Sequence, residues 1–286
     1  MAELIIIGGG PAGVSAALYA LRAGIKVLLL ENGPGSLAKA HRIENYYGTT
    51  ASGTELYAAG LEQAAALGAE IHCEEVLSLD YTGNFAVQTA SDIYTAPAVI
   101  LATGTKNATV RLAGLQRLEG RGVSYCAVCD GFFYRGKDVA VLGSGAYALH
   151  EADYLRHLAG SVTILTNGED GAAAKAAGFT VDERQLQEIN GEEKISGVTF
   201  TDGAILPLDG LFIALGTAGS SDMARKLGAM LNGRFIAIDA DGATNIPGLF
   251  AAGDCTGGML QVAKAVYEGA AAGSAAIKYL RTLNKQ

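Results

Sequence analysis

The chain has 286 residues, of which 50% are hydrophobic, and its formal net charge is −8 at pH 7. This length is enough for one large or two modest domains with buried cores. The negative charge argues against nucleic-acid binding, which needs a basic surface. The first ten residues have no basic stretch, and no apolar run approaches the length of a membrane span. We therefore expect no secretory signal, no membrane partner and a cytoplasmic location.

The first third of the chain begins with a strand, a glycine-rich turn and a helix, the order of a βαβ unit. β-Branched residues predict a buried strand over Leu4–Ile7, and a helix is expected from Gly13 to Ala23. The elements expected after these are a strand over Ile25–Leu30, a helix over Glu55–Leu67, short strands between Ile71 and Val87, and a buried strand over Val99–Leu101.

The middle of the chain repeats this order. Residues Lys106–Gly122 carry little pattern and are interpreted as the first crossing between two domains. The elements expected beyond them are a strand over Asp138–Leu142, a helix over Ala146–Leu158, a strand over Ser161–Leu165, a late strand over Leu249–Ala252 and a last helix from Leu260 toward Arg281. Two strand–glycine–helix units and 39 glycines favour an α/β fold with two domains.

The first glycine turn has the pattern of a dinucleotide-binding fingerprint. Gly8, Gly10 and Gly13 follow a strand and open a helix, so backbone N–H groups at the helix start can hold a pyrophosphate. An acid that binds ribose hydroxyls is expected at the end of the next strand, and Glu31 stands there, 31 − 8 = 23 positions after Gly8. The alternative is a glycine-rich turn that binds nothing.

A segment near the C-terminus favours a flavin over a free nicotinamide. Asp254 comes just after a predicted buried strand, where a carboxylate can accept a hydrogen bond from a ribityl or ribose hydroxyl. The helix that begins near Leu260 would direct its N-terminal dipole toward the flavin's pyrimidine end. A turn aspartate that only caps a helix is the alternative.

Two cysteines stand at the spacing of thioredoxin-like redox pairs, Cys126 and Cys129, and Asp130 follows directly. A disulfide at this spacing opens by thiolate attack, and a neighbouring acid can exchange the proton. Half of a zinc site or two buried thiols are the alternatives. Zinc needs four ligands, and Cys73, Cys255 and the four histidines supply no clustered second pair, so no metal is expected.

Four segments together resemble the low-molecular-weight thioredoxin reductase family, in its order: Gly8–Gly13, Ala102–Gly104, Gly120–Gly131 and Pro247–Gly258. The resemblance covers nearly the whole chain. It implies two Rossmann-like three-layer (ββα) nucleotide-binding domains, the second inserted into the first. Residues 1–109 and 235–286 would form the FAD-binding domain, and residues 110–234 would carry the CxxC pair on a degenerate pyridine-nucleotide-like fold.

The resemblance also implies a role for each site residue. Cys126 and Cys129 would be the redox pair, with Cys129 nearer the flavin, and Asp130 the proton donor. A homodimer and a thioredoxin or thioredoxin-like acceptor are implied as well. The residues expected to hold FAD, from the fingerprint and the resemblance together, are Gly8, Gly10, Pro11, Ala12, Gly13, Glu31, Ala102, Thr103, Gly104, Gly253, Asp254, Gln261 and Val262.

The second glycine turn departs from the family. Gly143 and Gly145 keep the fingerprint, although helix–strand packing alone can require them. Counting 23 positions from Gly143 reaches Thr166, which is not an acid, and the stretch Asn167–Asp170 lacks the His-Arg-Arg cluster of NADPH-using members. The chain is therefore most similar to members that lack the NADPH motif and take electrons from reduced ferredoxin. The alternatives are NAD(P)H-dependent reduction through atypical contacts and a redox-sensing flavoprotein without turnover.

Overall fold

The computed structural model describes residues 2–105 and 112–283. The chain forms two compact units, Met1–Thr105 with Gly219–Gln286 and the intervening Lys106–Ala218. The second unit is thus inserted into the first. The boundary expected between residues 109 and 110 lies outside the described residues.

The chain returns to the first unit at Gly219, earlier than the expected residue 235. The reason is a short helix, α7 (Ser220–Lys226), which packs against strands β4 and β17 of the first unit. In addition, the hydroxyls of Thr103 and Ser220 lie 2.5 Å apart, which ties the outgoing and returning segments together. Seven residues with few large apolar side chains give no strong pattern, so the sequence did not reveal this packing.

The first unit is built on a parallel sheet in the order β18-β7-β1-β2-β3. Its central strands are apolar except for Glu31 at the end of β2, because layers cover both faces of the sheet. The strands are β1 (Leu4–Ile7), β2 (Val27–Glu31), β3 (Glu70–Cys73), β7 (Ala98–Leu101) and β18 (Leu249–Ala251).

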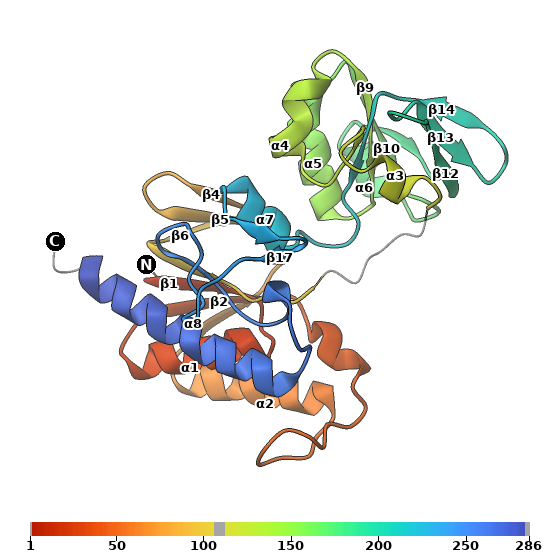
Figure 1. The fold of residues 1–286 in the computed structure, drawn as a ribbon. Coiled ribbons are helices and arrows are strands. Elements are labelled where there is room, and N and C mark those ends of the chain that lie inside the picture. The colour runs from red at the N-terminus through yellow and green to blue at the C-terminus, as the bar shows by residue number, and fades with distance from the viewer. Residues whose placement is uncertain (1, 106–111, 284–286) are drawn as a thin grey trace. The chain divides into compact units, whose positions relative to one another are not determined.

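Helices cover one face of this sheet, and a small antiparallel sheet lies on the other (Figure 1). This is the predicted three-layer arrangement. The helices are α1 (Pro11–Arg22), α2 (Gly53–Ala66) and α8 (Val262–Leu283), and the antiparallel strands are β4 (Val76–Tyr81), β5 (Phe85–Thr89) and β6 (Ile93–Ala96). The shorter elements are η1 (Gly35–Lys39), β16 (Leu231–Asn232), β17 (Phe235–Ile236) and η3 (Asp254–Thr256).

Helix α8 crosses α1 at very short range through two glycines. A Cβ atom at Gly269 would stand 2.1 Å from the carbonyl oxygen of Ala12, and one at Gly273 would stand 2.8 Å from that of Ala16. Glycine lowers helix propensity, so these positions weaken the isolated helix. In the folded chain they allow the two backbones to meet, and the helix–helix contact compensates for that cost.

The second unit repeats the three layers, which confirms the predicted fold class. Its parallel sheet has the order β11-β10-β9-β15-β8, and its antiparallel sheet has the order β12-β13-β14. The strands are β8 (Val123–Ser124), β9 (Asp138–Leu142), β10 (Ser161–Leu165), β11 (Thr180–Asp182), β12 (Leu186–Asn190), β13 (Gly197–Phe200), β14 (Ile205–Pro207) and β15 (Gly210–Ile213). The helices are α3 (Leu115–Leu118), α4 (Ala127–Asp130), η2 (Gly131–Tyr134), α5 (Ala146–Arg156) and α6 (Ala172–Ala176).

Within the described part of the chain, none of the helices combines the length and apolar character needed to cross a bilayer.

Candidate functional site

The residues expected to hold a cofactor gather at one edge of the first unit. Its five strands are parallel, so their carboxyl ends share that edge, where ligands bind in open α/β sheets. The predicted segments follow four of these strands: Gly8–Gly13 after β1, Glu31 at the end of β2, Ala102–Gly104 after β7, and Gly253–Asp254 after β18.

The glycines of the first turn have two different roles. Gly8 has φ +118°, and a Cβ there would stand 2.3 Å from the carbonyl oxygen of Ala102, while one at Gly13 would stand 1.8 Å from that of Gly8. Packing within the protein therefore requires both. A Cβ at Gly10 would meet nothing within 4 Å, so the protein leaves open space at the start of α1. Pro11 is the first residue of that helix, and the following N–H groups lack helical partners, which suits an anionic phosphate.

Glu31 is buried and held in place by hydrogen bonds. Its carboxylate accepts the backbone N–H of Gly33 at 2.8 Å and the hydroxyl of Tyr57 on α2. Burial alone would raise the pKa of Glu31, but the hydrogen bonds from Tyr57, Gly33 and Cys73 outweigh it and lower this pKa below its ordinary value. Glu31 is thus a fixed anion at the end of β2. Sequence reasoning did not identify Tyr57, because a tyrosine in a helix gives no signal of this contact.

The turn that carries Asp254 is clamped by two residues of α8 that sequence reasoning also missed. The ammonium of Lys264 donates to the carbonyl of Gly253 at 2.8 Å and pairs with Glu268 at 3.0 Å. Glu268 in turn accepts the N–H of Gly253 at 2.8 Å and the hydroxyl of Thr256 at 2.8 Å. Burial raises the pKa of the Asp254 carboxyl above its ordinary value, Lys264 opposes that rise, and Glu268 adds to it.

Gln261 and Val262 lie where the last helix begins, as expected. Val262 is the first residue of α8, and the carbonyl of Gln261 accepts the N–H of Ala265 at 3.0 Å. The side-chain amide of Asn45 donates to the Gln261 side chain at 2.8 Å, so the loop after η1 meets this helix start. Asn45 is a further residue that sequence reasoning did not single out.

These features fit FAD. Open space beside free N–H groups at the start of α1 suits the pyrophosphate, and the fixed carboxylate of Glu31 suits ribose hydroxyls. Asp254 supplies a second carboxyl on a clamped turn. When bound, FAD provides two-electron redox chemistry at its ring system, and the residues above would bind and orient it.

The second unit carries the redox pair. Cys126 and Cys129 form a disulfide with their Cα atoms 5.3 Å apart, around the short helix α4. The backbone N–H of Cys129 also donates to the sulfur of Cys126 at 3.2 Å. Cys126 is 1% exposed, whereas Cys129 is an exposed residue. Of the two cysteines, Cys129 is therefore the one exposed at the surface of the second unit.

Two further side chains contact the turn of the pair. The hydroxyl of Ser124 donates to the Asp130 carboxylate at 2.6 Å and accepts the N–H of Cys126 at 3.1 Å. Glu151 of α5, which is 2% exposed, accepts the N–H of Ala127 at 2.7 Å. Asp130 was expected next to the pair. Glu151 was not, because it is 22 positions from Cys129 (151 − 129). The sequence offered only a carboxylate on a helix face that is otherwise buried.

The second glycine turn keeps its packing role but holds a carboxylate. A Cβ at Gly143 would stand 2.2 Å from the carbonyl oxygen of Ala214, so the fold requires this glycine. The hydroxyl of Ser144, inside the turn, donates to the carboxylate of Glu169. Thr166, at the position of the ribose-binding acid, is 2% exposed and donates to the Glu169 carbonyl at 2.5 Å. An anion thus occupies this edge of the second sheet.

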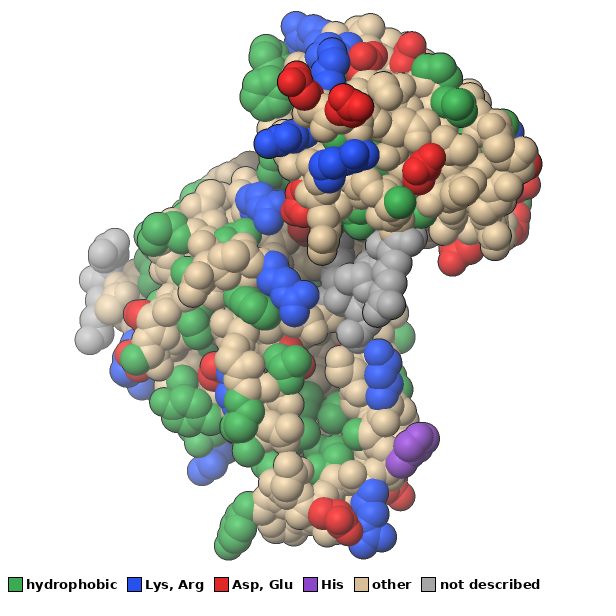
Figure 2. Space-filling view, turned by 45° about the vertical axis from the view of Figure 1, so that its right-hand side comes forward, with side chains coloured by type: hydrophobic (Ala, Val, Ile, Leu, Met, Phe, Trp, Pro, Cys, Tyr) green, Lys and Arg blue, Asp and Glu red, His purple; other side chains and the backbone are tan. Residues whose placement is uncertain are grey.

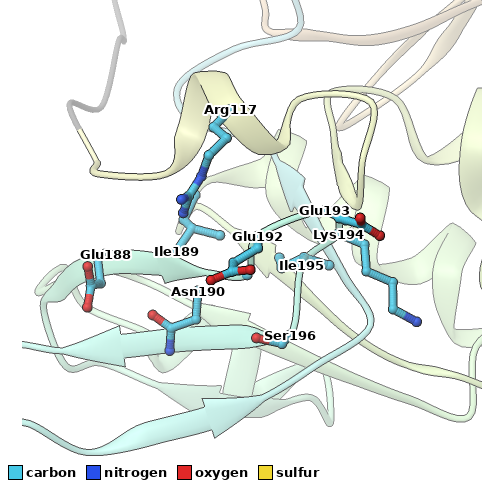
Figure 3. Close-up of a pocket in the computed structure, with 10 residues that line it drawn as sticks. Arg117, Glu188, Ile189, Asn190, Glu192, Glu193, Lys194, Ile195 and Ser196 are labelled. Atoms are coloured by element: carbon cyan, nitrogen blue, oxygen red, sulfur yellow. The ribbon is translucent and has the colours of Figure 1, made fainter.

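An open cavity of about 620 Å³ also lies in the second unit, beside the turn between β12 and β13 (Figure 3). Its side chains include Arg117, Glu188, Glu192 and Lys194. None of the predicted site residues lines it. Among residues 2–105 and 112–283, no three or more His, Cys, Asp or Glu side chains are grouped as a metal site would require.

Comparisons with known proteins identify the family of the chain. Residues 2–269 match the model of the pyridine nucleotide-disulphide oxidoreductase family. A thioredoxin reductase of Listeria monocytogenes is 36% identical over 99% of this chain and 95% of its own length. The crystal structure of the atypical thioredoxin reductase TRi of Desulfovibrio vulgaris Hildenborough is similar, with a TM-score of 0.93 and 42% identity over 99% of both chains. A ferredoxin-flavin thioredoxin reductase of Clostridium acetobutylicum has a TM-score of 0.73 and 31% identity over 100% of this chain and 99% of its own.

The two Rossmann-like units, one of which carries a disulfide, and these similarities define a flavoprotein oxidoreductase. The chain belongs to the pyridine nucleotide-disulphide oxidoreductase family and, within it, to the low-molecular-weight thioredoxin reductases. Its cofactor is FAD, as expected from the sequence.

Proposed function

We propose that the protein reduces the disulfide of thioredoxin or a thioredoxin-like protein through Cys126 and Cys129, and that its electron donor is reduced ferredoxin rather than NADPH. The observation that carries the reductase part is the Cys126–Cys129 disulfide in a unit inserted into an FAD-binding one. The thirteen residues predicted to hold FAD, at the carboxyl edge of the first unit's parallel sheet, would bind the cofactor, and Asp130 would be the proton donor.

The exchange with the acceptor follows from the chemistry of the pair. After reduction, the pair carries one thiolate and one thiol, and Asp130 is protonated. The thiolate attacks the acceptor disulfide, forms a mixed disulfide and releases one acceptor thiolate, which takes the proton of Asp130. The other cysteine gives its proton to Asp130 and attacks the sulfur of the first. This restores the Cys126–Cys129 disulfide, and the second acceptor sulfur takes that proton from Asp130 and leaves as a thiol. The accessible position of Cys129 supports its assignment as the cysteine that faces the flavin.

A protein acceptor is supported by the apolar surface next to the pair. Val128 is 40% exposed, Phe132 is 66% exposed and Phe133 is 68% exposed, all within four residues of Cys129. Adjacent exposed aromatic side chains are typical of protein interaction sites. Arg135 stacks over Phe132 and adds a cation. Figure 2 shows exposed hydrophobic side chains beside Lys and Arg side chains on one face of the molecule.

The donor assignment is supported by the second glycine turn. A pyridine nucleotide there would bring its phosphates against the Glu169 carboxylate that Ser144 holds. Two like charges 4 Å apart repel by about 4 kcal/mol at the effective dielectric constant of a protein surface. The similarity to a ferredoxin-flavin thioredoxin reductase supports ferredoxin as the alternative source of electrons. A homodimer and a cytoplasmic location, both expected from the sequence, belong to the same proposal.

Anaerobic reduction of the purified flavoprotein tests the donor. The flavin absorbance is followed after mixing with NADPH, NADH and chemically reduced ferredoxin in parallel. We expect bleaching with ferredoxin and none with micromolar NADPH or NADH. Rapid bleaching by either nucleotide would favour the NAD(P)H-dependent alternative. A Cys129→Ser variant that still performs the cellular role would favour the sensor.

A further inference from the structure

The dithiol turn has a buried anionic neighbour that the proposed exchange does not use. Glu151 is 2% exposed, on α5, and its carboxylate oxygen lies 2.7 Å from the backbone nitrogen of Ala127. Ala127 directly follows Cys126 and is the first residue of α4. The carboxylate is therefore one peptide unit away from the buried cysteine.

Two opposite influences act on a thiolate at Cys126. The N–H of Cys129 points at the Cys126 sulfur at 3.2 Å, and an N–H at a helix start stabilises a thiolate. The Glu151 carboxylate accepts the neighbouring N–H of Ala127 and so places a negative charge one peptide unit from Cys126. In a buried environment this repulsion is poorly screened.

We propose that Glu151 is a positioning residue that makes the Cys126–Cys129 dithiol a stronger reductant. It fixes the start of α4, and its charge destabilises the Cys126 thiolate of the reduced form. A dithiol whose reduced form is less stable has a lower reduction potential and passes its electrons more completely to an acceptor. The inference rests on the proposed function only in taking this pair as the redox pair.

Glu151→Gln separates charge from geometry, since the amide oxygen still accepts the N–H of Ala127. The holoprotein is equilibrated anaerobically with mixtures of reduced and oxidised dithiothreitol, and the dithiol fraction is read from alkylation and mass. In this exchange one dithiothreitol gives up two electrons and two protons and closes to its cyclic disulfide. Cys126–Cys129 takes up the two electrons and one proton as a Cys126 thiolate and a Cys129 thiol, and the other proton goes to the buffer. We expect the equilibrium constant to shift about tenfold toward the dithiol, which corresponds to about 30 mV.

The matched control is Asp153→Asn on the same helix. Its side chain is 62% exposed and paired with Arg156, so the same charge is removed away from the dithiol. We expect the equilibrium constant of Asp153→Asn with dithiothreitol to stay within twofold of the parent value. Circular dichroism verifies that each variant is folded. A second variant, Glu151→Asp, withdraws the carboxylate by one methylene, and its equilibrium constant should shift in the same direction as that of Glu151→Gln. An unchanged equilibrium constant in whichever of the two Glu151 variants folds overturns the proposal. The measurement needs neither ferredoxin nor thioredoxin, so it stands even if the proposed donor or acceptor is wrong.

Discussion

At the scale of single residues, the edge proposed to bind FAD contains two carboxyl groups whose pKa values move in opposite directions. Hydrogen bonds keep Glu31 ionised, whereas burial makes the ionised form of Asp254 costly. Neither effect is visible from residue type alone. Each leads to a different dependence of stability on pH, and the two residues are therefore tested separately.

Asp254→Asn should stabilise the FAD-free protein at pH 7 while it weakens FAD binding. Burial raises the pKa of Asp254 in the folded state, so folding stability falls as pH rises above the ordinary value of 3.8, and the full cost is present once the folded group ionises. The amide carries no such cost. Loss of a hydrogen bond to a charged group corresponds to about 1.5–3 kcal/mol, or roughly tenfold to a hundredfold in affinity for FAD. Thermal melts of the FAD-free variant and flavin fluorescence titrations measure both effects, and an unchanged FAD affinity would contradict the assignment.

Tyr57→Phe should destabilise the first unit most at neutral pH. The lost hydroxyl leaves a buried carboxylate with one donor fewer, which costs about 1.5–3 kcal/mol. Because the pKa of Glu31 is lowered in the folded state, its contribution is present above the ordinary value of 4.5 and lost as pH falls below it. The difference between the variant and the parent should therefore shrink at acid pH. Urea unfolding at several pH values measures it, with Tyr267→Phe on the exposed face of α8 as control.

At the scale of elements, Gly269 and Gly10 lead to opposite expectations. Gly269→Ala should lower the free energy of unfolding by about 1–3 kcal/mol, because its Cβ would stand 2.1 Å from the carbonyl oxygen of Ala12 and α8 must shift.

Gly10→Ala should leave the FAD-free protein as stable as the parent, since its Cβ meets nothing within 4 Å. It should nevertheless reduce FAD affinity, because the methyl group occupies the space expected for the pyrophosphate. A Gly10→Ala variant with full FAD affinity would argue against a phosphate at this turn.

The elements also show what the sequence could and could not reveal. Apolar runs such as Leu4–Ile7 identify buried strands, and glycine spacing identifies strand–turn–helix units, because these signals are local. Tyr57, Lys264 and Glu151 escaped prediction because their partners are distant in sequence. Their side chains are ordinary helix residues until the fold places Glu31, Gly253 and Ala127 against them.

At the scale of the whole molecule, the two units have separate hydrophobic cores. The core of the first unit contains residues from β1, β2, β7 and α8, and that of the second contains buried residues between Leu118 and Ile213. Each unit has its own sheets and helices. We therefore expect calorimetry to resolve two unfolding transitions.

FAD should shift only one of these transitions. A ligand at one hundred times its dissociation constant stabilises the unit that binds it by about 2.7 kcal/mol. Scans with and without added FAD test this, and the disulfide-reduced protein identifies the transition of the second unit. A single transition that moves as a whole with FAD would contradict independent unfolding.

The second glycine turn has one more consequence, for what its motif indicates. Helix α5 starts at that turn, and its Glu151 and Leu155 side chains lie under the segment that carries the pair. Gly143 is therefore needed to build the sulfur site whether or not a pyridine nucleotide binds at this turn. The glycine motif alone is thus a poor guide to which electron source such a sequence uses.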